Sequence, residues 1–233
     1  MIIGISGKIG SGKDTVGKII QYLTVTSEEH QKEDLQDNTF IGELLVSNHF
    51  SNWQIKKFAD KLKECISIIT GISRVDLEKE EIKNSNLPEE WDTNKPFEDI
   101  YGTKYMNPKK TPITVRTLLQ LFGTEVGRQI HPNFWVNALF SDYDKYTSKS
   151  ENWIITDVRF PNELEAVKKR DGIVIRINRP FANPNDHNIQ LVGQHISETA
   201  LDEAKFDYTI DNNGTIEDLI EKVKQILIKE NLL

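Results

Sequence analysis

The chain has 233 residues, of which 37% are hydrophobic and 28% charged, and its formal net charge is −7. This composition is typical of a globular domain rather than a disordered chain, and the acidic balance argues against a nucleic acid polymer as partner. No apolar stretch approaches the roughly 18 residues that cross a bilayer, and no signal peptide precedes the first motif, so we expect no membrane partner and a cytoplasmic location.

Short apolar runs alternate with amphipathic patterns along the chain. The runs that indicate buried strands are residues 2–6, 54–58, 153–156, 173–177 and 208–210. The helical patterns cover residues 13–23, 61–70, 115–121, 133–143, 163–170 and 216–228. This alternation predicts an α/β fold with a five-stranded, mainly parallel sheet flanked by helices. In such a sheet, ligands bind at the carboxyl ends of the strands.

Residues 7–15 read Gly-Lys-Ile-Gly-Ser-Gly-Lys-Asp-Thr and lie between the first strand and the first helix. Glycines let the backbone curl so that successive N–H groups converge on an anion, and the helix N-terminus adds positive charge. The pattern therefore predicts a phosphate-binding loop for a nucleoside triphosphate, with Lys13 between the β- and γ-phosphates. The residues expected to contact the donor are Gly7, Lys8, Gly10, Ser11, Gly12, Lys13, Asp14 and Thr15.

The loop ends in Lys13-Asp14-Thr15, whereas most phosphate loops have a hydroxyl residue directly after the lysine to reach Mg²⁺. This ending resembles the loops of nucleoside monophosphate kinases more than those of GTPases or motor ATPases. Asp14 suits the first turn of a helix, and it is expected either to cap that helix or to hold Mg²⁺ through water. Thr15 is the expected direct contact to phosphate.

An apolar strand that ends in aspartate often supplies a second carboxylate linked to Mg²⁺ in phosphate-loop proteins. Asp157 stands at that position, and Arg159 follows two residues later. Arginine meets phosphate oxygens in pairs, so it suits the neutralisation of a transferred phosphoryl group. Other candidates for this work, each of which could instead form an ordinary surface ion pair, are Arg116, Arg128, Arg176 and Arg179.

Three segments interrupt the alternation. Residues 24–52 are polar and indicate a solvated surface insertion, and residues 73–112 are long enough for a substrate-binding insertion. Residues 178–196 hold two prolines and two histidines without periodicity, which indicates a lid. His195 in that lid could contact a phosphate or cap the following helix. We also expect residues 123–128 to form a hinge between two helices, and the whole chain, 1–233, to be a single domain.

Taken in order, these blocks resemble the deoxynucleoside monophosphate kinases of bacteriophages and some bacteria. The resemblance runs from residue 1 to about residue 228 and includes the phosphate loop. The other blocks are Phe-Ala-Asp-Lys-Leu-Lys at 58–63, Leu-Leu-Gln at 118–120, Gly-Thr-Glu-Val-Gly-Arg at 123–128, Thr-Asp-Val-Arg-Phe-Pro-Asn-Glu at 156–163, Arg-Pro at 179–180, His-Ile-Ser-Glu-Thr at 195–199 and Asp-Tyr-Thr-Ile-Asp-Asn at 207–212. It implies a phosphate-loop kinase core with a substrate-binding insertion and a lid.

The resemblance implies transfer of the γ-phosphoryl group of ATP, with Mg²⁺, to a deoxynucleoside 5′-monophosphate, and it leaves the preferred base open. It implies that Arg179 arrives from the lid, and that Asp157 and Glu163 orient arginines or metal-bound water. The residues that it assigns to the acceptor or transferred phosphate are Arg116, Arg128 and Arg159. One departure is that Gly10 precedes Ser11 where a basic residue is expected, so that Lys8 is the nearest replacement.

Two other functions remain open at this stage. One is another small-molecule kinase of related fold, such as a dephospho-coenzyme A kinase, and the other is a regulatory protein that binds ATP without transferring phosphate. The set of arginines disfavours the second, because a switch needs no clamp for an acceptor phosphate. A homodimer also stays open, and a phage-encoded enzyme would act in the host cytoplasm.

Overall fold

The computed structural model describes residues 1–24, 51–88, 91, 97–98, 104–105, 113–146, 151–180 and 196–233. The chain forms two compact units, of which the first comprises Met1–Phe58 with Ala138–Leu233 and the second comprises Ala59–Asn137. The boundaries between them fall inside two helices, α4 (Phe58–Thr70) and α8 (Phe134–Tyr146). Within the described ranges, no helix is long and apolar enough to cross a bilayer.

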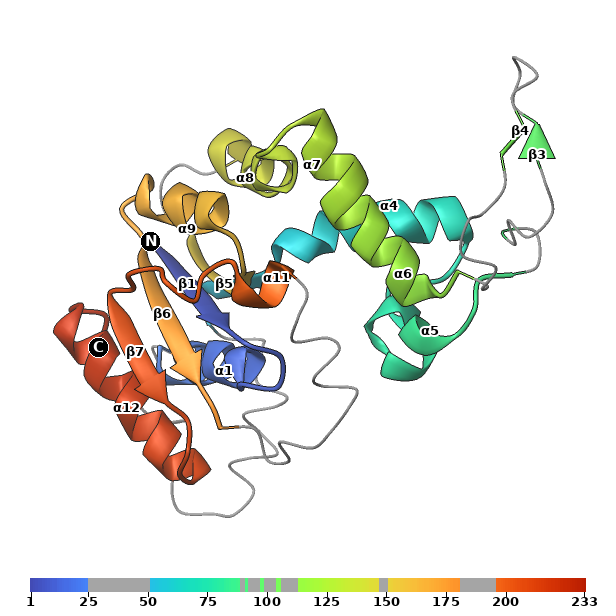
Figure 1. Ribbon diagram of the computed structural model, residues 1–233. Helices are drawn as coiled ribbons and strands as arrows, with labels where there is room; N and C mark the ends of the chain where they lie inside the picture. Colours follow the sequence, from blue (N-terminus) through green and yellow to red (C-terminus); the bar gives the residue numbers. More distant parts are fainter. Residues whose placement is uncertain are drawn as a thin grey trace. The chain divides into compact units, whose positions relative to one another are not determined.

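The first unit is built on a five-stranded sheet (Figure 1). Its strands, in the spatial order β2-β5-β1-β6-β7, are all parallel to their neighbours. Because β1 lies in the centre and later strands add on both sides of it, the strand order reverses there, and such a reversal opens a crevice for ligands. The predicted five-stranded parallel sheet is confirmed, and its strands are β1 (Ile2–Gly7), β2 (Trp53–Lys56), β5 (Asn152–Val158), β6 (Ile173–Asn178) and β7 (Tyr208–Asp211).

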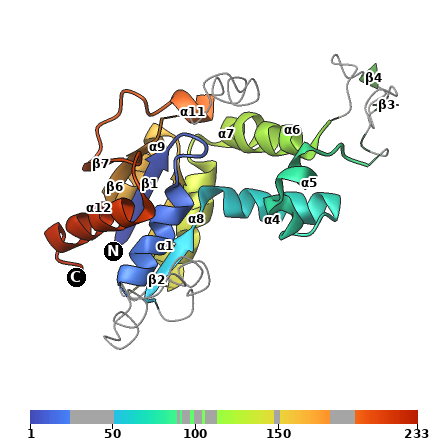
Figure 2. The same ribbon diagram turned by 90° about the horizontal axis from the view of Figure 1, so that it is seen from below.

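Helices cover both faces of this sheet, with α1 (Lys13–Leu23) and α12 (Ile216–Lys229) on one side and α9 (Pro161–Lys168) on the other (Figure 2). Apolar residues of α1 and α12 pack on the buried isoleucines of β1, β5 and β6 to form the main core. On the α9 side, Gly4 leaves room for three valines, because a Cβ at this position would lie 3.1–3.4 Å from Val158, Val174 and Val167. The buried apolar strands thus explain why the sequence shows continuous runs rather than alternation.

The second predicted strand is wrong at its end. Residues 54–58 were expected as one strand, but β2 ends at Lys56 and Phe58 begins α4. The backbone N–H of Phe58 donates to Oδ1 of Asp157 over 2.8 Å, so a side chain from β5 satisfies one of the amides that a helix start leaves open. The ring of Phe58 then packs edge-on against Phe140 of α8, at 6.0 Å between ring centroids.

The second unit is mainly helical and has its own small core. Buried side chains at its centre are Ile66, Leu77, Leu87 and Val115. Its elements after α4 are η1 (Asp76–Glu78), α5 (Glu80–Asn84), the short antiparallel pair β3 (Phe97–Glu98) and β4 (Lys104–Tyr105), α6 (Val115–Gln120), η3 (Leu121–Val126) and α7 (Gly127–Ile130). The expected insertion of residues 73–112 belongs to this unit, although much of it lies outside the described residues.

The predicted hinge at residues 123–128 is also wrong, because α6, η3 and α7 form one continuous helix whose middle part, η3, is a π-helix (Figure 1). The carbonyl of Gly123 accepts a hydrogen bond from the indole N–H of Trp135 over 2.7 Å, and the N–H of Gly127 donates to Phe122, five residues earlier. A side chain that occupies one carbonyl displaces the regular helical ladder, which accounts for the wider turn.

Candidate phosphate-binding site

The phosphate loop joins the carboxyl end of β1 to the first turn of α1. Gly12 has a φ of 96°, in the left-handed region that favours glycine, and its carbonyl accepts from Val16 to start the helix. Asn212, which follows β7, donates its side-chain amide to the carbonyl of Ser11 over 2.9 Å. A Cβ at Gly12 would lie 2.7 Å from that same amide nitrogen, so the loop and Asn212 require a glycine there.

Lys13 points back into the loop. Its Nζ donates to the carbonyl oxygens of Gly7 and Lys8, both at 2.7 Å. Burial lowers the pKa of the Lys13 ammonium to about 8, and the nearby charge of Arg159 contributes to the decrease, while the carboxylates of Glu198 and others oppose it. The strand, loop and helix therefore bring the predicted lysine to the centre of a compact group of charges.

Asp14 is held by two groups that the sequence alone did not bring together. Its Oδ1 accepts from the hydroxyl of Thr156 at 2.7 Å and lies 2.9 Å from Nζ of Lys57, which follows β2. Partial burial raises the pKa of the Asp14 carboxyl, but the hydrogen bonds from Lys57 and Thr156 outweigh it and lower that pKa. Asp14 is therefore an anion with a cationic partner, and Lys57 is a charged residue of the site that sequence analysis missed.

The carboxylates expected to bind Mg²⁺ have the right chemistry for it. In nucleotide enzymes, Mg²⁺ keeps several waters and takes one or two carboxylates besides the phosphates. Asp14 and Asp157 provide two carboxylates, of which Asp157 uses Oδ1 to accept from Phe58, and Thr15 adds a half-buried hydroxyl residue. Across the described residues, no group of three histidine, cysteine or acidic side chains could hold a metal unaided. The set fits a metal ion that arrives with the nucleotide.

Arg159 is fixed at both ends. Its backbone N–H donates to Oε2 of the buried Glu163 over 2.8 Å, and the N–H of Phe160 donates to the same oxygen over 3.1 Å. Its guanidinium pairs with the carboxylate of Glu198 in α11 (Ile196–Thr199). The other oxygen of Glu198 accepts from the backbone N–H of Ile9 in the phosphate loop over 2.8 Å. Glu198 is the second charged residue that sequence analysis missed.

A further ion-pair cluster follows α11. Asp202 lies 3.3 Å from Nζ of Lys8 and 3.1 Å from a terminal nitrogen of Arg176. Arg176 also donates to the hydroxyl of Ser6 on β1 over 3.1 Å. Lys8, the expected replacement for a basic residue at position 10, is therefore paired with Asp202. Arg176 pairs with the same carboxylate and with Ser6, at the ends of β6 and β1.

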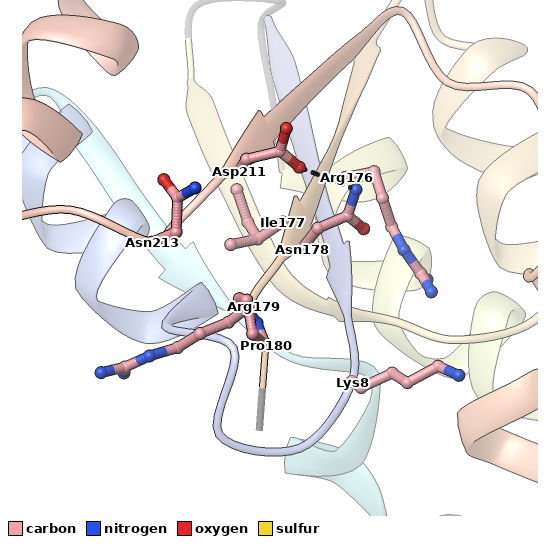
Figure 3. Close-up of a pocket in the computed structure, with 8 residues that line it drawn as sticks. All are labelled: Lys8, Arg176, Ile177, Asn178, Arg179, Pro180, Asp211 and Asn213. Carbon is pink, nitrogen blue, oxygen red and sulfur yellow. Dashed lines mark hydrogen bonds between the residues drawn. The ribbon is translucent and has the colours of Figure 1, made fainter. Parts of the chain in front are cut away.

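A pocket of about 250 Å³ opens at the carboxyl ends of β6 and β7, beside the phosphate loop. In Figure 3, the side chain of Arg179 extends away from those of Lys8 and Arg176, toward the side of Asn213. The amide of Asn178 donates to Asp211 over 3.2 Å and so ties the two strand ends together. The residues that line the pocket are Lys8, Arg176, Ile177, Asn178, Arg179, Pro180, Asp211 and Asn213.

The remaining predicted residues lie elsewhere. Arg116 in α6 and the half-buried Arg128 in α7 belong to the second unit. There, Arg116 donates to Asn84 over 3.0 Å and pairs with Glu80. His195, like most of the predicted lid and of the 24–52 insertion, lies outside the described residues. In the first unit, the structure brings together residues of the phosphate loop with Asp157, Arg159 and Glu163 and with the pocket that contains Arg179.

Comparisons of the sequence with a family model and with known proteins point to the same family. The family model described as "Deoxynucleotide monophosphate kinase" matches residues 23–223. The deoxynucleotide monophosphate kinase of Enterobacteria phage T4 is 31% identical over 127 residues, which are 54% of this chain and 50% of that protein. The deoxynucleoside-5′-monophosphate kinase of Escherichia phage T5 is 26% identical over 234 residues, which are 86% of this chain and 85% of that protein.

Among solved structures, a dephospho-CoA kinase from Campylobacter jejuni is similar at 12% identity and a TM-score of 0.43, over 100% of this chain and 98% of that one. This similarity is too low to support an argument about the substrate. The family match covers most of the chain and begins after the phosphate loop, so loop and match are separate observations. The chain belongs to the deoxynucleotide monophosphate kinase family.

Proposed function

We propose that this protein transfers the γ-phosphoryl group of ATP to a deoxynucleoside 5′-monophosphate, giving the diphosphate and ADP. The observation that carries the proposal is the convergence of Lys13 and Arg159 at the phosphate loop. Lys13 donates to two loop carbonyls. Arg159 is held beside the loop by Glu198, which also accepts from the Ile9 amide. Two cations beside a helix N-terminus and a loop of backbone amides are suited to stabilise the charge of a phosphoryl group. Family membership supplies the class of acceptor.

The donor phosphates would lie along the loop from Gly7 to Thr15, on its backbone amides and on the ammonium of Lys13. The Lys13 ammonium already donates to two loop carbonyls, so it is oriented before any phosphate arrives. The pocket beside the loop would take the base of ATP, between Arg179 and Asn213. Its volume of about 250 Å³ is below the roughly 300–1,000 Å³ of sites for drug-sized molecules, so it suits part of a nucleotide.

Magnesium would be held by Asp14 and Asp157, directly or through water, with Thr15 in support. When bound, the ion neutralises the negative charge of the phosphates and aligns them. Lys57 would also help to neutralise charge here, because its Nζ already pairs with the carboxylate of Asp14. Arg159, fixed by Glu163 through its backbone, would stabilise the charge that spreads over the transferred group.

The acceptor phosphate would be bound by Arg116, Arg128 and Arg159, with His195 and Arg179 contributing from the segment that follows β6. Transfer between two existing phosphates needs positioning and charge neutralisation rather than a general base, which agrees with a site composed of cations and carboxylates. The proposal includes a single catalytic domain over residues 1–233, with substrate binding by residues 73–112 and a lid at 178–196. It also includes a cytoplasmic location, and it permits a homodimer, which light scattering would reveal as twice the chain mass.

The test is an assay of ADP release with ATP, Mg²⁺ and each deoxy- and ribonucleoside monophosphate in turn, with dephospho-coenzyme A as a competing acceptor. Turnover with one or more deoxynucleotides, and its loss in Lys13→Met, is the expected result. Turnover with dephospho-coenzyme A alone would show that the acceptor is dephospho-coenzyme A and not a deoxynucleoside monophosphate. Tight ATP binding without turnover on any acceptor would favour a nucleotide-binding switch.

A further inference from the structure

The carboxylate of Glu198 is a deeply buried charged group in direct contact with the phosphate loop. Its side chain is only 2% exposed, whereas that of its partner Arg159 is 33% exposed. One oxygen accepts from the Ile9 amide at 2.8 Å, and the other pairs with the Arg159 guanidinium. A buried carboxylate is retained only where its charge and its hydrogen-bonding capacity are satisfied, and here both oxygens are engaged.

These two contacts connect three separate parts of the first unit. Ile9 belongs to the loop after β1, Arg159 follows β5, and Glu198 lies in α11. The Ile9 amide belongs to the loop whose other N–H groups are expected to bind phosphate, and its bond to Glu198 fixes the first part of that loop. Since a single carboxylate holds both this amide and the guanidinium, a shift of Glu198 would displace the loop and Arg159 together.

The charge of Glu198 also helps to hold Arg159 in place. Lys13 and Arg159 are close enough for their charges to interact unfavourably, and Glu198 acts on Lys13 in the opposite sense. Without the carboxylate of Glu198, the guanidinium of Arg159 would gain by turning toward solvent, because its side chain is already one-third exposed. The buried carboxylate therefore keeps Arg159 directed to the site against the repulsion of Lys13.

Its neighbour Asp202 shows the contrast. Asp202 pairs with Lys8 and Arg176 from an exposed position, with 36% of its side chain accessible. Exposed ion pairs contribute little, because solvent screens them. The two carboxylates lie on the same short segment, but only Glu198 is buried, and only Glu198 contacts the main chain of the phosphate loop.

We infer that Glu198 is a positioning residue for phosphoryl transfer: it sets the side chain of Arg159 and the first part of the phosphate loop in the arrangement that the transfer step uses. This inference rests on the proposed function for its kinetic consequence. Its structural part, the coupling of the loop to Arg159 through one carboxylate, does not depend on the substrate.

The kinetic test compares Glu198→Gln with the wild type and with Glu203→Gln, an exposed glutamate in the turn that follows α11. The amide keeps the size of the side chain but loses the charge, so it cannot satisfy both the Ile9 N–H and Arg159 as the carboxylate does. We expect kcat to fall roughly ten- to a hundredfold, by analogy with the loss of a residue that orients a metal ligand. The KM values for both nucleotides should change less than kcat, and Glu203→Gln should match the wild type.

A double-mutant cycle tests whether Glu198 acts through Arg159. If it does, adding Glu198→Gln to Arg159→Ala should reduce kcat little further, because the group that Glu198 positions is already absent. Losses that multiply, or a kcat of Glu198→Gln within twofold of the wild type, would overturn the inference. A drop in melting temperature with unchanged kcat would likewise mean that Glu198 only stabilises the fold.

A measurement without turnover separates this inference from the proposed function. Amide hydrogen exchange of the peptide that contains Ile9 should accelerate in Glu198→Gln and in Arg159→Ala, but not in Glu203→Gln, in the nucleotide-free protein. If exchange is faster in these two variants but the wild type phosphorylates no monophosphate, the proposed function is refuted. The coupling of the loop to Arg159 through Glu198 would still be supported. Unchanged exchange of that peptide in both variants would refute the coupling, whatever the activity.

Discussion

The side-chain amide of Asn212 donates to the backbone carbonyl of Ser11 over 2.9 Å, across a separation of 201 positions in the sequence. The contact fastens the phosphate loop to the chain that follows the edge strand β7. A Cβ at Gly12 would lie only 2.7 Å from this same amide nitrogen, which is too close for a side chain. One asparagine thus fixes both the position of the loop and the need for glycine at its last turn.

Replacing that asparagine should weaken donor binding. In Asn212→Asp, a carboxylate would face the Ser11 carbonyl, so a donor is exchanged for an acceptor and the hydrogen bond is lost, at a cost of about 1 kcal/mol or more. We expect the KM for ATP to rise roughly fivefold or more, which corresponds to that energy, while the KM for the monophosphate changes less. Steady-state kinetics with each nucleotide varied would measure this, with the exposed Thr209→Ala on β7 as control. An equal rise in both KM values would contradict a role confined to the donor loop.

Removal of the loop lysine should abolish transfer. Lys13→Met deletes a charge-assisted contact to the transferring group, and losing one such contact typically reduces kcat about a hundredfold or more. The control is Lys18→Met on the same helix, which should retain activity. Stopped-flow or coupled assays would measure kcat, and near-normal turnover in Lys13→Met would rule out the loop as the donor site.

Arg128 should matter for the acceptor. In Arg128→Ala we expect the KM for the monophosphate to rise roughly tenfold or more, because a charged hydrogen bond to phosphate is worth about 1.5–3 kcal/mol. The KM for ATP should change little. The exposed Gln129→Ala in the same short helix α7 is the matched control. A comparable rise for ATP would move Arg128 to the donor side or to a structural role.

Replacing Asp14 should raise the Mg²⁺ concentration that the enzyme requires. The carboxylate is anionic and shared with Lys57 and Thr156. Asp14→Asn removes the charge but keeps the oxygen that accepts from Thr156, so the Mg²⁺ concentration for half-maximal rate should increase several-fold while melting temperature changes little. Glu64→Gln, an exposed change on α4, serves as control. The same Mg²⁺ midpoint in Asp14→Asn and wild type would exclude Asp14 from the metal site.

The second unit should lose stability in acid through Glu78. Partial burial raises the pKa of the Glu78 carboxyl, but hydrogen bonds from Lys63 and Arg74 outweigh it and lower the pKa to about 2. Because this folded-state pKa lies below the ordinary value of 4.5, the contribution is full above pH ~4.5 and is lost as the pH falls toward 2.

Glu78→Gln should therefore flatten the dependence of unfolding free energy on pH in that window. The expected difference is only about 0.5 kcal/mol, since nearly half of the Glu78 side chain is exposed and solvent screens the pair. Urea unfolding at a series of pH values would measure it, with the exposed Glu81→Gln for comparison. Equal slopes in wild type and Glu78→Gln would show that the ion pairs do not persist in solution.

Local sequence was sufficient for the central strands and the phosphate loop of the first unit. Apolar runs at 2–6, 153–156 and 173–177 are long and unbroken, and they became β1, β5 and β6 because burial on both faces needs no alternation. The glycine loop and Lys13 were equally legible, since their geometry depends on residues close in sequence. By contrast, the end of β2 and the continuous helix through η3 were misjudged, because Asp157 and Trp135 act on them from other elements.

The sequence by itself determined a phosphate loop on a parallel sheet and a family of kinases to compare it with. Only the tertiary structure decided which charges share a partner: Lys57 with Asp14, Glu198 with Arg159 and Ile9, and Asn212 with Ser11. None of these pairs has a spacing that a local pattern could reveal. Parallel strands connected by long crossovers bring their carboxyl ends to one edge, and the partners are set by strand order rather than by distance along the chain.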